Sequence, residues 1–369
     1  MAKATQSTRA LDNAPRGPTR DFVPAILMAG PAIVLMLLFL IGPFFAGIGF
    51  SFTNQRLITA NPTEFVGLRN YSRLVRMSVL PVQQEVDAAT GQPAVDDEGN
   101  SVFPRSRDYT RNTEEYPQYE GLREWFSVDV GNTRYYILAA DPTFLRSVIN
   151  VLLFAILVIP LQMGLGLLLA VLVNQKLAGR NIFRTIYFSP VVTSMVVISI
   201  VWTFLYDKDN GLVNQFLQVF GLPNVNWLGN PTTAMPAIII MSVWQGVGMQ
   251  MVLFLAGLQG IPEQLYEAAG IDGANGWQKF RFITLPGLRN VTVFIIITIT
   301  IAAFQLFTQV YVMTNGGPND STTTVVFEMV RKGFREQDIA AAAAIGVLFF
   351  LFILGISLLQ RRILRDQEA

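Results

Sequence analysis

The chain has 369 residues, of which 51% are hydrophobic and only 14% are charged, and its formal net charge is +1. Soluble domains carry about a quarter charged residues, so roughly a tenth of the expected charge is missing. The sequence contains no cysteine and no histidine, which excludes disulfides, thiolate chemistry and metal sites built from these residues. The near-zero net charge gives no indication of a nucleic-acid partner.

Charged residues are absent from several long apolar stretches of the chain. A charge-free apolar stretch of about 20 residues can cross the hydrocarbon core of a bilayer as a helix. We therefore predict an all-α membrane protein and exclude a single soluble domain. The predicted spans are residues 23–51, 145–174, 183–206, 233–258, 289–313 and 339–361. The first is too long for the apolar core of a cleaved signal peptide.

The long charge-free stretch before the fourth span contains a polar part. Residues 212–231 include several asparagines and two prolines, which favours an amphipathic surface helix followed by a loop. We therefore count one span in this stretch and six in the chain. The six spans fall into two regions. Residues 22–52 form the first membrane helix, and residues 144–362 form a core of five helices.

Basic residues are distributed unevenly over the short connections. One side of the predicted membrane carries 13 Lys and Arg, including those of both terminal tails, and the other side carries 4. Because basic residues are retained on the cytoplasmic side, both tails, residues 1–21 and 363–369, are predicted to be cytoplasmic.

The segment 53–143 between the first and second spans is then extracytoplasmic. Residues 52–143 contain 9 basic and 13 acidic residues, a soluble composition with a mild negative charge. Two interpretations remain open, a partly flexible loop and a small folded cap that contacts a partner. The aromatic residues that could form a small core in the second case are Tyr109, Tyr116, Tyr119, Trp125, Tyr135 and Tyr136.

None of the six spans has an ionisable residue in its interior. Transporters driven by protons or sodium usually carry such residues within the membrane, so we expect the energy to come from outside this chain. The spans do contain amides and hydroxyls, among them Asn150, Gln162, Ser242 and Gln250. These groups are expected to bond neighbouring helices or to contact an uncharged polar ligand.

The connection 261–286 after the fourth span carries the most informative pattern. Pro262 suits the first turn of a short helix, and Gly270 suits its end. Asp272 is then expected to cap a second helix, which Pro286 closes before the fifth span. Small residues keep the bend narrow enough to enter a cleft on another protein, and two carboxylates could pair with basic groups there.

The spacing E-A-A-x-x-D-G-A-x-x-x-x-x-F-x-x-I-x-L-P in this connection resembles the coupling loop of binding-protein-dependent ABC importer permeases. The resemblance implies that this loop seats against an ATPase subunit. The implied coupling residues are Glu267, Ala268, Ala269, Gly270, Asp272, Gly273, Ala274, Phe280, Leu285 and Pro286, and Ile283 completes the pattern.

Three flanking segments are similar to the carbohydrate-uptake members of that family, the maltose, glycerol-3-phosphate and α-glucoside permeases. They are Ser51 to Asn54, Val66 to Tyr71 and Met313 to Pro318. The resemblance implies a multi-pass subunit of the cell inner membrane that imports a carbohydrate. Its implied partners are a second homologous permease, two ATPase subunits and an extracytoplasmic solute-binding protein.

The resemblance also implies that this chain is not an enzyme. ATP and Mg²⁺ would be bound by the ATPase partners, because the chain lacks a phosphate-binding loop of the G-x-x-x-x-G-K-[ST] type. A sugar pathway should be lined by neutral polar groups and by aromatic or thioether faces. The candidate pathway residues, at helical 3–4 spacing, are Ser242, Gln245, Gly246 and Met249 in the fourth span and Ala302, Gln305, Leu306 and Gln309 in the fifth.

Two alternatives remain. The chain could be an integral-membrane enzyme with catalytic carboxylates in segment 53–143, or an importer permease for a solute other than a sugar. The resemblance favours a role for segment 53–143 in docking or orienting the solute-binding protein.

Overall fold

The computed structural model describes residues 22–59, 61–86, 93–95, 101–175 and 179–365. The tail 1–21 and the last four residues of the tail 363–369 therefore lie outside the described residues. The chain divides into two compact units, residues 1–49 and residues 50–369. The first unit contains α1 (Phe22–Met36), a π-helical turn η1 (Leu37–Ile41) and most of α2 (Gly42–Ser51).

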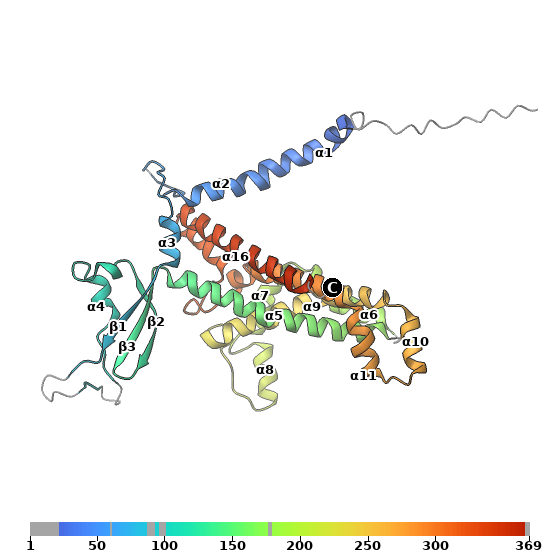
Figure 1. Ribbon diagram of the computed structural model, residues 1–369. Coiled ribbons are helices and arrows are strands. Elements are labelled where there is room, and N and C mark those ends of the chain that lie inside the picture. Colours follow the sequence, from blue (N-terminus) through green and yellow to red (C-terminus); the bar gives the residue numbers. More distant parts are fainter. Residues whose placement is uncertain (1–21, 60, 87–92, 96–100, 176–178, 366–369) are drawn as a thin grey trace, which may run out of the picture. The chain divides into compact units, whose positions relative to one another are not determined.

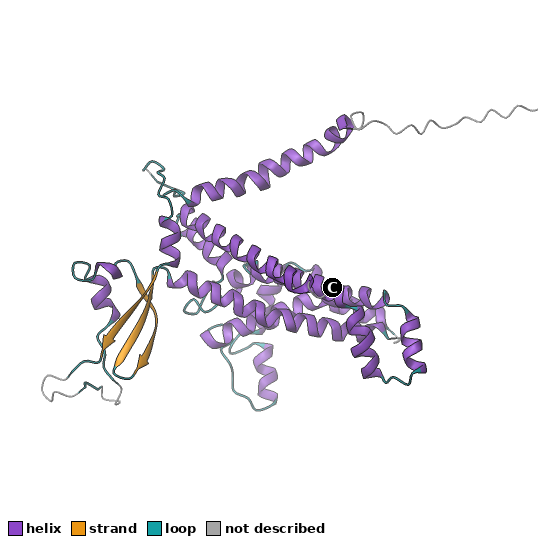
Figure 2. Cartoon of the chain, viewed as in Figure 1, coloured by secondary structure: helices purple, strands orange, loops and turns teal. Residues whose placement is uncertain are grey.

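The second unit is a helix bundle that carries a small sheet at one end and a helical hairpin at the other (Figures 1 and 2). Its helices are α3 (Arg69–Val75), α4 (Ser106–Arg111), α5 (Pro142–Asn174), α6 (Arg180–Val192), α7 (Met195–Leu205), α8 (Leu212–Val219), α9 (Pro231–Gln259), α10 (Glu263–Ile271), α11 (Gly276–Lys279), α12 (Leu285–Gly287), α13 (Arg289–Phe304), α14 (Thr308–Met313), α15 (Val325–Val330) and α16 (Ile339–Arg365). Shorter turns are the 3₁₀ turn η2 (Pro117–Tyr119) and the π-helical turns η3 (Phe280–Thr284) and η4 (Arg331–Arg335).

Five helical stretches of the described chain are long and apolar enough to cross a membrane: 27–51, 142–174, 231–259, 289–313 and 339–360. They correspond to the first, second, fourth, fifth and sixth predicted spans. A sixth crossing results if the bent pair α6–α7 counts as one span. The prediction of a helical membrane protein is therefore confirmed, and α8 lies within the stretch where a short amphipathic helix was expected.

The third span is not the single helix that we predicted over 183–206. It is broken into α6 and α7, whose axes are bent by 101°. Thr193 and Ser194 between them have extended backbone angles, and Pro190 in the last turn of α6 provides no backbone N–H. The fifth span is also interrupted, because the helical path stops at Phe304 and resumes at Thr308. The predicted spans rested on charge-free length, which does not register such breaks.

The described part of segment 53–143 is folded around a three-stranded antiparallel sheet, which we did not predict. Its strands are β1 (Met77–Gln83), β2 (Arg123–Val130) and β3 (Thr133–Ala139), in the order β1-β3-β2. One face of the sheet forms a core of Leu80, Val82, Tyr136 and Leu138 with Leu122, against which Tyr109 and Tyr119 pack. Of the expected aromatic core, Tyr135 is instead exposed.

Two of the flanking sequence motifs are joined by hydrogen bonds. The buried amide of Asn70 donates to the carbonyl oxygens of Ser51 (2.8 Å) and Thr53 (2.7 Å). The hydroxyls of Ser51 and Tyr71 lie 2.6 Å apart. These bonds fix α3 against the start of the second unit, which explains why the two short motifs occur together.

The helices α5 and α9 form the central contact of the bundle through a reciprocal arrangement of glycine and glutamine. The Gln162 amide on α5 donates to the Ser242 carbonyl (2.8 Å) and lies over Gly246, where any Cβ atom would overlap it. Four residues further along both helices, Gln250 on α9 lies over Gly166 on α5. A Cβ atom at position 166 would be 2.6 Å from the Gln250 Cβ. Each glycine thus makes room for the glutamine of the other helix.

This packing makes Gly166→Ala destabilising. The added methyl has to push α9 away, and such overpacking costs about 1–3 kcal/mol. The measurement is the thermal unfolding midpoint of the purified chain in detergent, which should fall. Gly164→Ala on the same helix is the matched control, since nothing lies within 4 Å of its added Cβ. Equal midpoints for the two variants would contradict the proposed tight contact.

Candidate functional site

The connection 261–286 forms a helical hairpin at the end of the bundle opposite the sheet (Figure 1). Its first arm is α10, and its second arm runs through α11, η3 and α12. The hydroxyls of Tyr266 and Thr284 lie 2.9 Å apart and join the two arms. Thr284 is buried, so this contact lies at the base of the hairpin.

The turn between the arms differs from the prediction. α10 continues to Ile271 rather than ending at Gly270, and Gly273 takes the left-handed backbone conformation (φ +74°) just after it. The Ala274 N–H then bonds back to the Ala269 carbonyl (2.8 Å), which closes the helix end. A residue with a side chain is strained at such a position, so the turn requires glycine at 273.

Asp272 does not cap the second helix, as we had expected. Asn275 takes that role: its side chain accepts a hydrogen bond from the Gln278 N–H (2.9 Å), and the Gln278 side chain accepts one from the Asn275 N–H (2.7 Å). This reciprocal pair is a capping box. Asp272 is exposed as a result, and its carboxylate is free of the capping role that the sequence suggested.

Pro286 does not close the second helix either, since it lies within a helical run that continues through α12. The π-helical turn η3 precedes it, with the Leu285 N–H bonded to the Phe280 carbonyl. The wider turn changes the hydrogen-bond register just before the proline, whose missing N–H would leave an acceptor unpaired in a regular helix.

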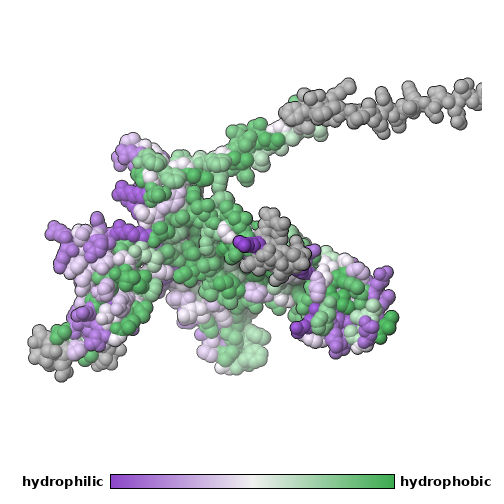
Figure 3. Space-filling model, in the orientation of Figure 1, coloured by the Kyte–Doolittle hydropathy of each residue, from purple (hydrophilic) through white to green (hydrophobic). Residues whose placement is uncertain are grey.

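The hairpin exposes both charge and apolar surface (Figure 3). Glu267 and Asp272 are exposed, as are Ala268, Gly270 and Gly273, whereas Ala269, Ala274 and Phe280 are half-buried. Large apolar side chains are exposed on the same hairpin, with Ile271 at 88%, Phe282 at 69% and Trp277 at 66%. Leu285 and Pro286 are exposed near its base. A surface of this kind is characteristic of contact with another protein.

The predicted pathway residues of the fourth span do not all share one environment. Ser242 is buried and Gly246 lies beneath Gln162, so both belong to the α5–α9 contact. Gln245 is half-buried, and Met249 is 44% exposed. Two buried polar atoms near this contact, Ser242 Oγ and Gln250 Oε1, have no hydrogen-bond partner among the described residues. Gln162 and Gln250 were noted as polar span residues but were not predicted as pathway residues.

In the fifth span, the break after Phe304 separates the predicted pathway residues. Leu306 is buried at 2% exposure, whereas Ala302 and Gln305 are exposed and Gln309 is half-buried. The prediction that these four share one helix face is wrong, because helical 3–4 spacing applies only within a continuous helix.

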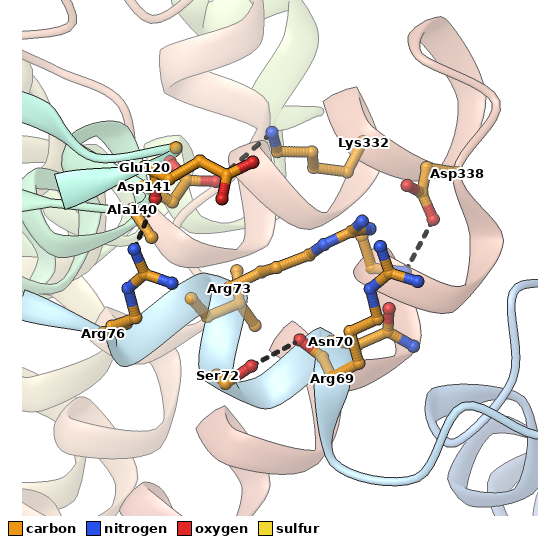
Figure 4. Close-up of a pocket in the computed structure, with 13 residues that line it drawn as sticks. Arg69, Asn70, Ser72, Arg73, Arg76, Glu120, Ala140, Asp141, Lys332 and Asp338 are labelled. Atoms are coloured by element: carbon orange, nitrogen blue, oxygen red, sulfur yellow. Dashed lines mark hydrogen bonds and ion pairs between the residues drawn. The ribbon is translucent and has the colours of Figure 1, made fainter. Parts of the chain in front are cut away.

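A cluster of charges at the sheet end of the bundle was not predicted from the sequence. The carboxylate of Glu328 is fully buried and lies 2.7 Å from Arg331 and 3.8 Å from Lys332. Burial raises the pKa of the Glu328 carboxyl, and the charges of Arg331 and Lys332 act against that rise. Lys332 also pairs with Asp141 at the start of α5 (3.2 Å; Figure 4). The i, i+3 and i, i+4 spacing of the three residues was the available sequence signal.

The segment 313–324 is held to α5 beside this cluster. The Asn150 amide donates to the carbonyl oxygens of Asp320 (3.0 Å) and Thr323 (2.8 Å), and Arg146 donates to the Asn319 carbonyl (2.8 Å). In the part of the chain that the structure describes, no three His, Cys, Asp or Glu residues come together as a metal site.

The hairpin turn gives a prediction about Gly273. Gly273→Ala has ample space but places a side chain at φ +74°, which costs about 1 kcal/mol. Amide hydrogen exchange over residues 263–279 should become faster, because the turn that orders both arms is weakened. Gly276→Ala is the control, since it is equally unobstructed and has no positive φ. If both variants exchange alike, the strain argument is wrong.

The sequence matches the family described as "Binding-protein-dependent transport system inner membrane component" over residues 162–368. A curated relative, the probable ABC transporter permease protein YurN of Bacillus subtilis, is 35% identical over 63% of this chain and 81% of the relative. The arabinooligosaccharides transport system permease protein AraP of Bacillus subtilis is 35% identical over 63% and 75%. The trehalose/maltose transport system permease protein MalF of Thermococcus litoralis is 34% identical over 63% and 79%.

Among solved structures, the fold is similar to a bacterial ABC transporter involved in the import of the acidic polysaccharide alginate. The TM-score is 0.63, with 20% identity over 94% of this chain and 96% of the other. At this identity the likeness supports the fold alone. The extent of the family match shows that the chain belongs to the inner-membrane components of binding-protein-dependent transport systems.

Proposed function

We propose that the chain is the permease subunit of an ATP-driven importer of carbohydrates, and that it lines part of the translocation pathway. In this proposal a second homologous permease completes the pathway, and two ATPase subunits bind ATP and Mg²⁺. An extracytoplasmic solute-binding protein delivers the sugar. The chain itself performs no catalysis and binds no cofactor.

The observation that carries this proposal is the hairpin at one end of the bundle. It presents two exposed carboxylates, Glu267 and Asp272, beside exposed apolar side chains such as Ile271. An exposed apolar surface with charges at its rim suits a groove on a partner with basic residues. The hairpin directly continues α9 and leads into α13, so a displacement of the docked hairpin would move membrane helices as rigid bodies.

The spans provide a second argument for an external source of energy. Asn210 to Pro262 and Asn290 to Asn319 contain no Asp, Glu, Lys or Arg. Proton-coupled and ion-coupled transporters usually depend on such residues within the membrane. An ATPase partner that acts through the hairpin provides the work without them.

The substrate class is inferred from chemistry and from relatives. The unpartnered Ser242 Oγ and Gln250 Oε1 are neutral hydrogen-bonding atoms, which suit hydroxyl groups better than ions. The named systems of relatives carry arabinooligosaccharides, trehalose and maltose, and the Rhizobium radiobacter relative LacF (36% identical) belongs to a lactose system. We therefore infer a carbohydrate substrate and retain Gln245, Met249, Gln305 and Gln309 as pathway candidates.

The deciding experiment reconstitutes this chain in liposomes with the permease, ATPase and binding protein encoded beside it. ATP-dependent uptake of a radiolabelled sugar that the binding protein binds is the expected result. Uptake of an amino acid or phosphate alone would replace the substrate class. Chemical turnover of a sugar by the isolated chain would instead favour the membrane-enzyme alternative.

Glu267→Lys should abolish ATP-driven uptake while the chain still inserts in the membrane. Reversing the charge of a docked side chain opposes a basic partner surface, and loss of a desolvated pair costs about 2–5 kcal/mol. Uptake and the amount of ATPase that co-purifies are the two measurements. Glu114→Lys is the matched control, since this carboxylate is exposed in the segment at the opposite end. Normal values of both quantities for Glu267→Lys would refute hairpin docking.

We also propose that the hairpin is cytoplasmic and the sheet extracytoplasmic, with both chain termini cytoplasmic. The chain has no native cysteine, so single cysteines at Ser127 and Gln278, both exposed, are selective probes. In intact cells an impermeant maleimide should label position 127 and leave position 278 unlabelled until the membrane is opened. Labelling of both positions from outside would contradict the orientation.

A further inference from the structure

The basic residues of the extracytoplasmic segment are gathered in one place, although the segment as a whole is acidic. Of the 9 arginines between residues 52 and 143, six line two neighbouring cavities, whereas only three of the 13 acidic residues do. The cavities measure about 550 and 830 Å³ and share Gly121 in their lining. The mild negative charge inferred from composition therefore does not describe this surface.

The smaller cavity is lined by one face of α3. Arg69 and Arg73 are four residues apart on α3, so they project from the same side of the helix, and Arg76 lines the cavity from the extended residue that follows α3. Figure 4 shows Arg69 and Arg73 extending toward the segment that carries Lys332 and Asp338. Like charges at this spacing repel each other, which costs free energy unless an anion offsets it.

Two of the three carboxylates that line this cavity, Asp141 and Asp338, are already engaged, and the third belongs to Glu120. Asp141 pairs with Lys332 (3.2 Å) and accepts a hydrogen bond from the Phe144 N–H (3.0 Å) at the start of α5. Asp338 accepts one from the Ala341 N–H (2.8 Å) at the start of α16. Arg69 and Arg73 form no ion pair with any residue in the described ranges, and Arg76 donates to the neutral carbonyl of Glu120.

The larger cavity also has more arginines than carboxylates in its lining. Arg107 and Arg111 from α4 and Arg123 from β2 line it, and none forms an ion pair within the described part of the chain. Glu124 is the one carboxylate of its lining, and it accepts a hydrogen bond from the Ser106 hydroxyl (2.5 Å). Guanidinium groups bind carboxylates with two parallel hydrogen bonds, so each free arginine is a ready site for an acidic side chain.

We propose that these two cavities form one docking surface for acidic residues of the solute-binding protein, an inference that rests on the proposed function. The six arginines come from α3 and the residue after it, from α4 and from β2, and they are spread over both cavities, which suits a protein surface with several carboxylates better than one small anion. The surface lies at the end of the bundle opposite the hairpin (Figure 1). Its exposed positive charges would speed encounter and set orientation.

The test uses the assembled importer in nanodiscs and measures its affinity for the binding protein encoded beside it. Arg73→Glu should raise the dissociation constant at least about threefold at low salt, and Arg69→Glu with Arg73→Glu about tenfold. Raising the salt concentration should narrow these differences, because screening weakens the attraction in the parent complex. Arg73→Lys should retain most of the affinity, which distinguishes a charge effect from a folding defect.

Arg56→Glu is the matched control, since Arg56 is exposed in the same segment but lines neither cavity. Unchanged affinity in the double variant would overturn the docking surface. If the binding protein neither binds the parent importer nor stimulates its ATP hydrolysis, the proposed function fails instead.

Discussion

The contact between α5 and α9 is the interaction on which the rest of the bundle depends. A bilayer offers no hydrophobic drive for helices to associate, so close packing and interhelical hydrogen bonds have to hold them. Gly166 and Gly246 allow both, since each admits the glutamine of the opposite helix. α5 begins beside the sheet and α9 ends at the hairpin, so one locked pair connects the two ends of the bundle.

Composition and local pattern were sufficient for most of the fold. Charge-free stretches of the required length predicted five of the membrane helices, since the cost of burying charge in hydrocarbon is independent of the detailed packing. The hairpin was equally accessible because residues 261–286 carry small and acidic residues at a recognisable fixed spacing. Its turn chemistry was not, since Asp272 and Asn275 are both good N-cap residues and the choice between them depends on where Gly273 ends α10.

Several features that we did not predict depend on contacts between segments that are distant in the sequence. Charge-free length does not register the bend of 101° between α6 and α7, although Pro190 and the pair Thr193-Ser194 are local signals of a helix end and a helix start that we did not use. The strand β3 pairs with β1, more than 50 residues earlier in the chain, and such pairing leaves no local signal. Leu306 is buried because the chain leaves the helical path beside it. The 3–4 spacing in the sequence is real, but without a continuous helix it does not place these residues on one face.

Neutral polar groups and charged groups lie in different parts of the bundle. The membrane interior is restricted to neutral amides and hydroxyls such as Gln162 and Ser242, because charge is costly there. Charge is instead concentrated at the two ends, as exposed carboxylates on the hairpin and as arginines around Gly121 that form no ion pair within the described ranges. In the proposed function, partners that are recognised by charge bind at these ends, and the neutral interior is left to the solute. The locked pair α5–α9 spans the distance between them, and the proposed function uses this pair as the rigid body that connects the two ends without charges in the membrane.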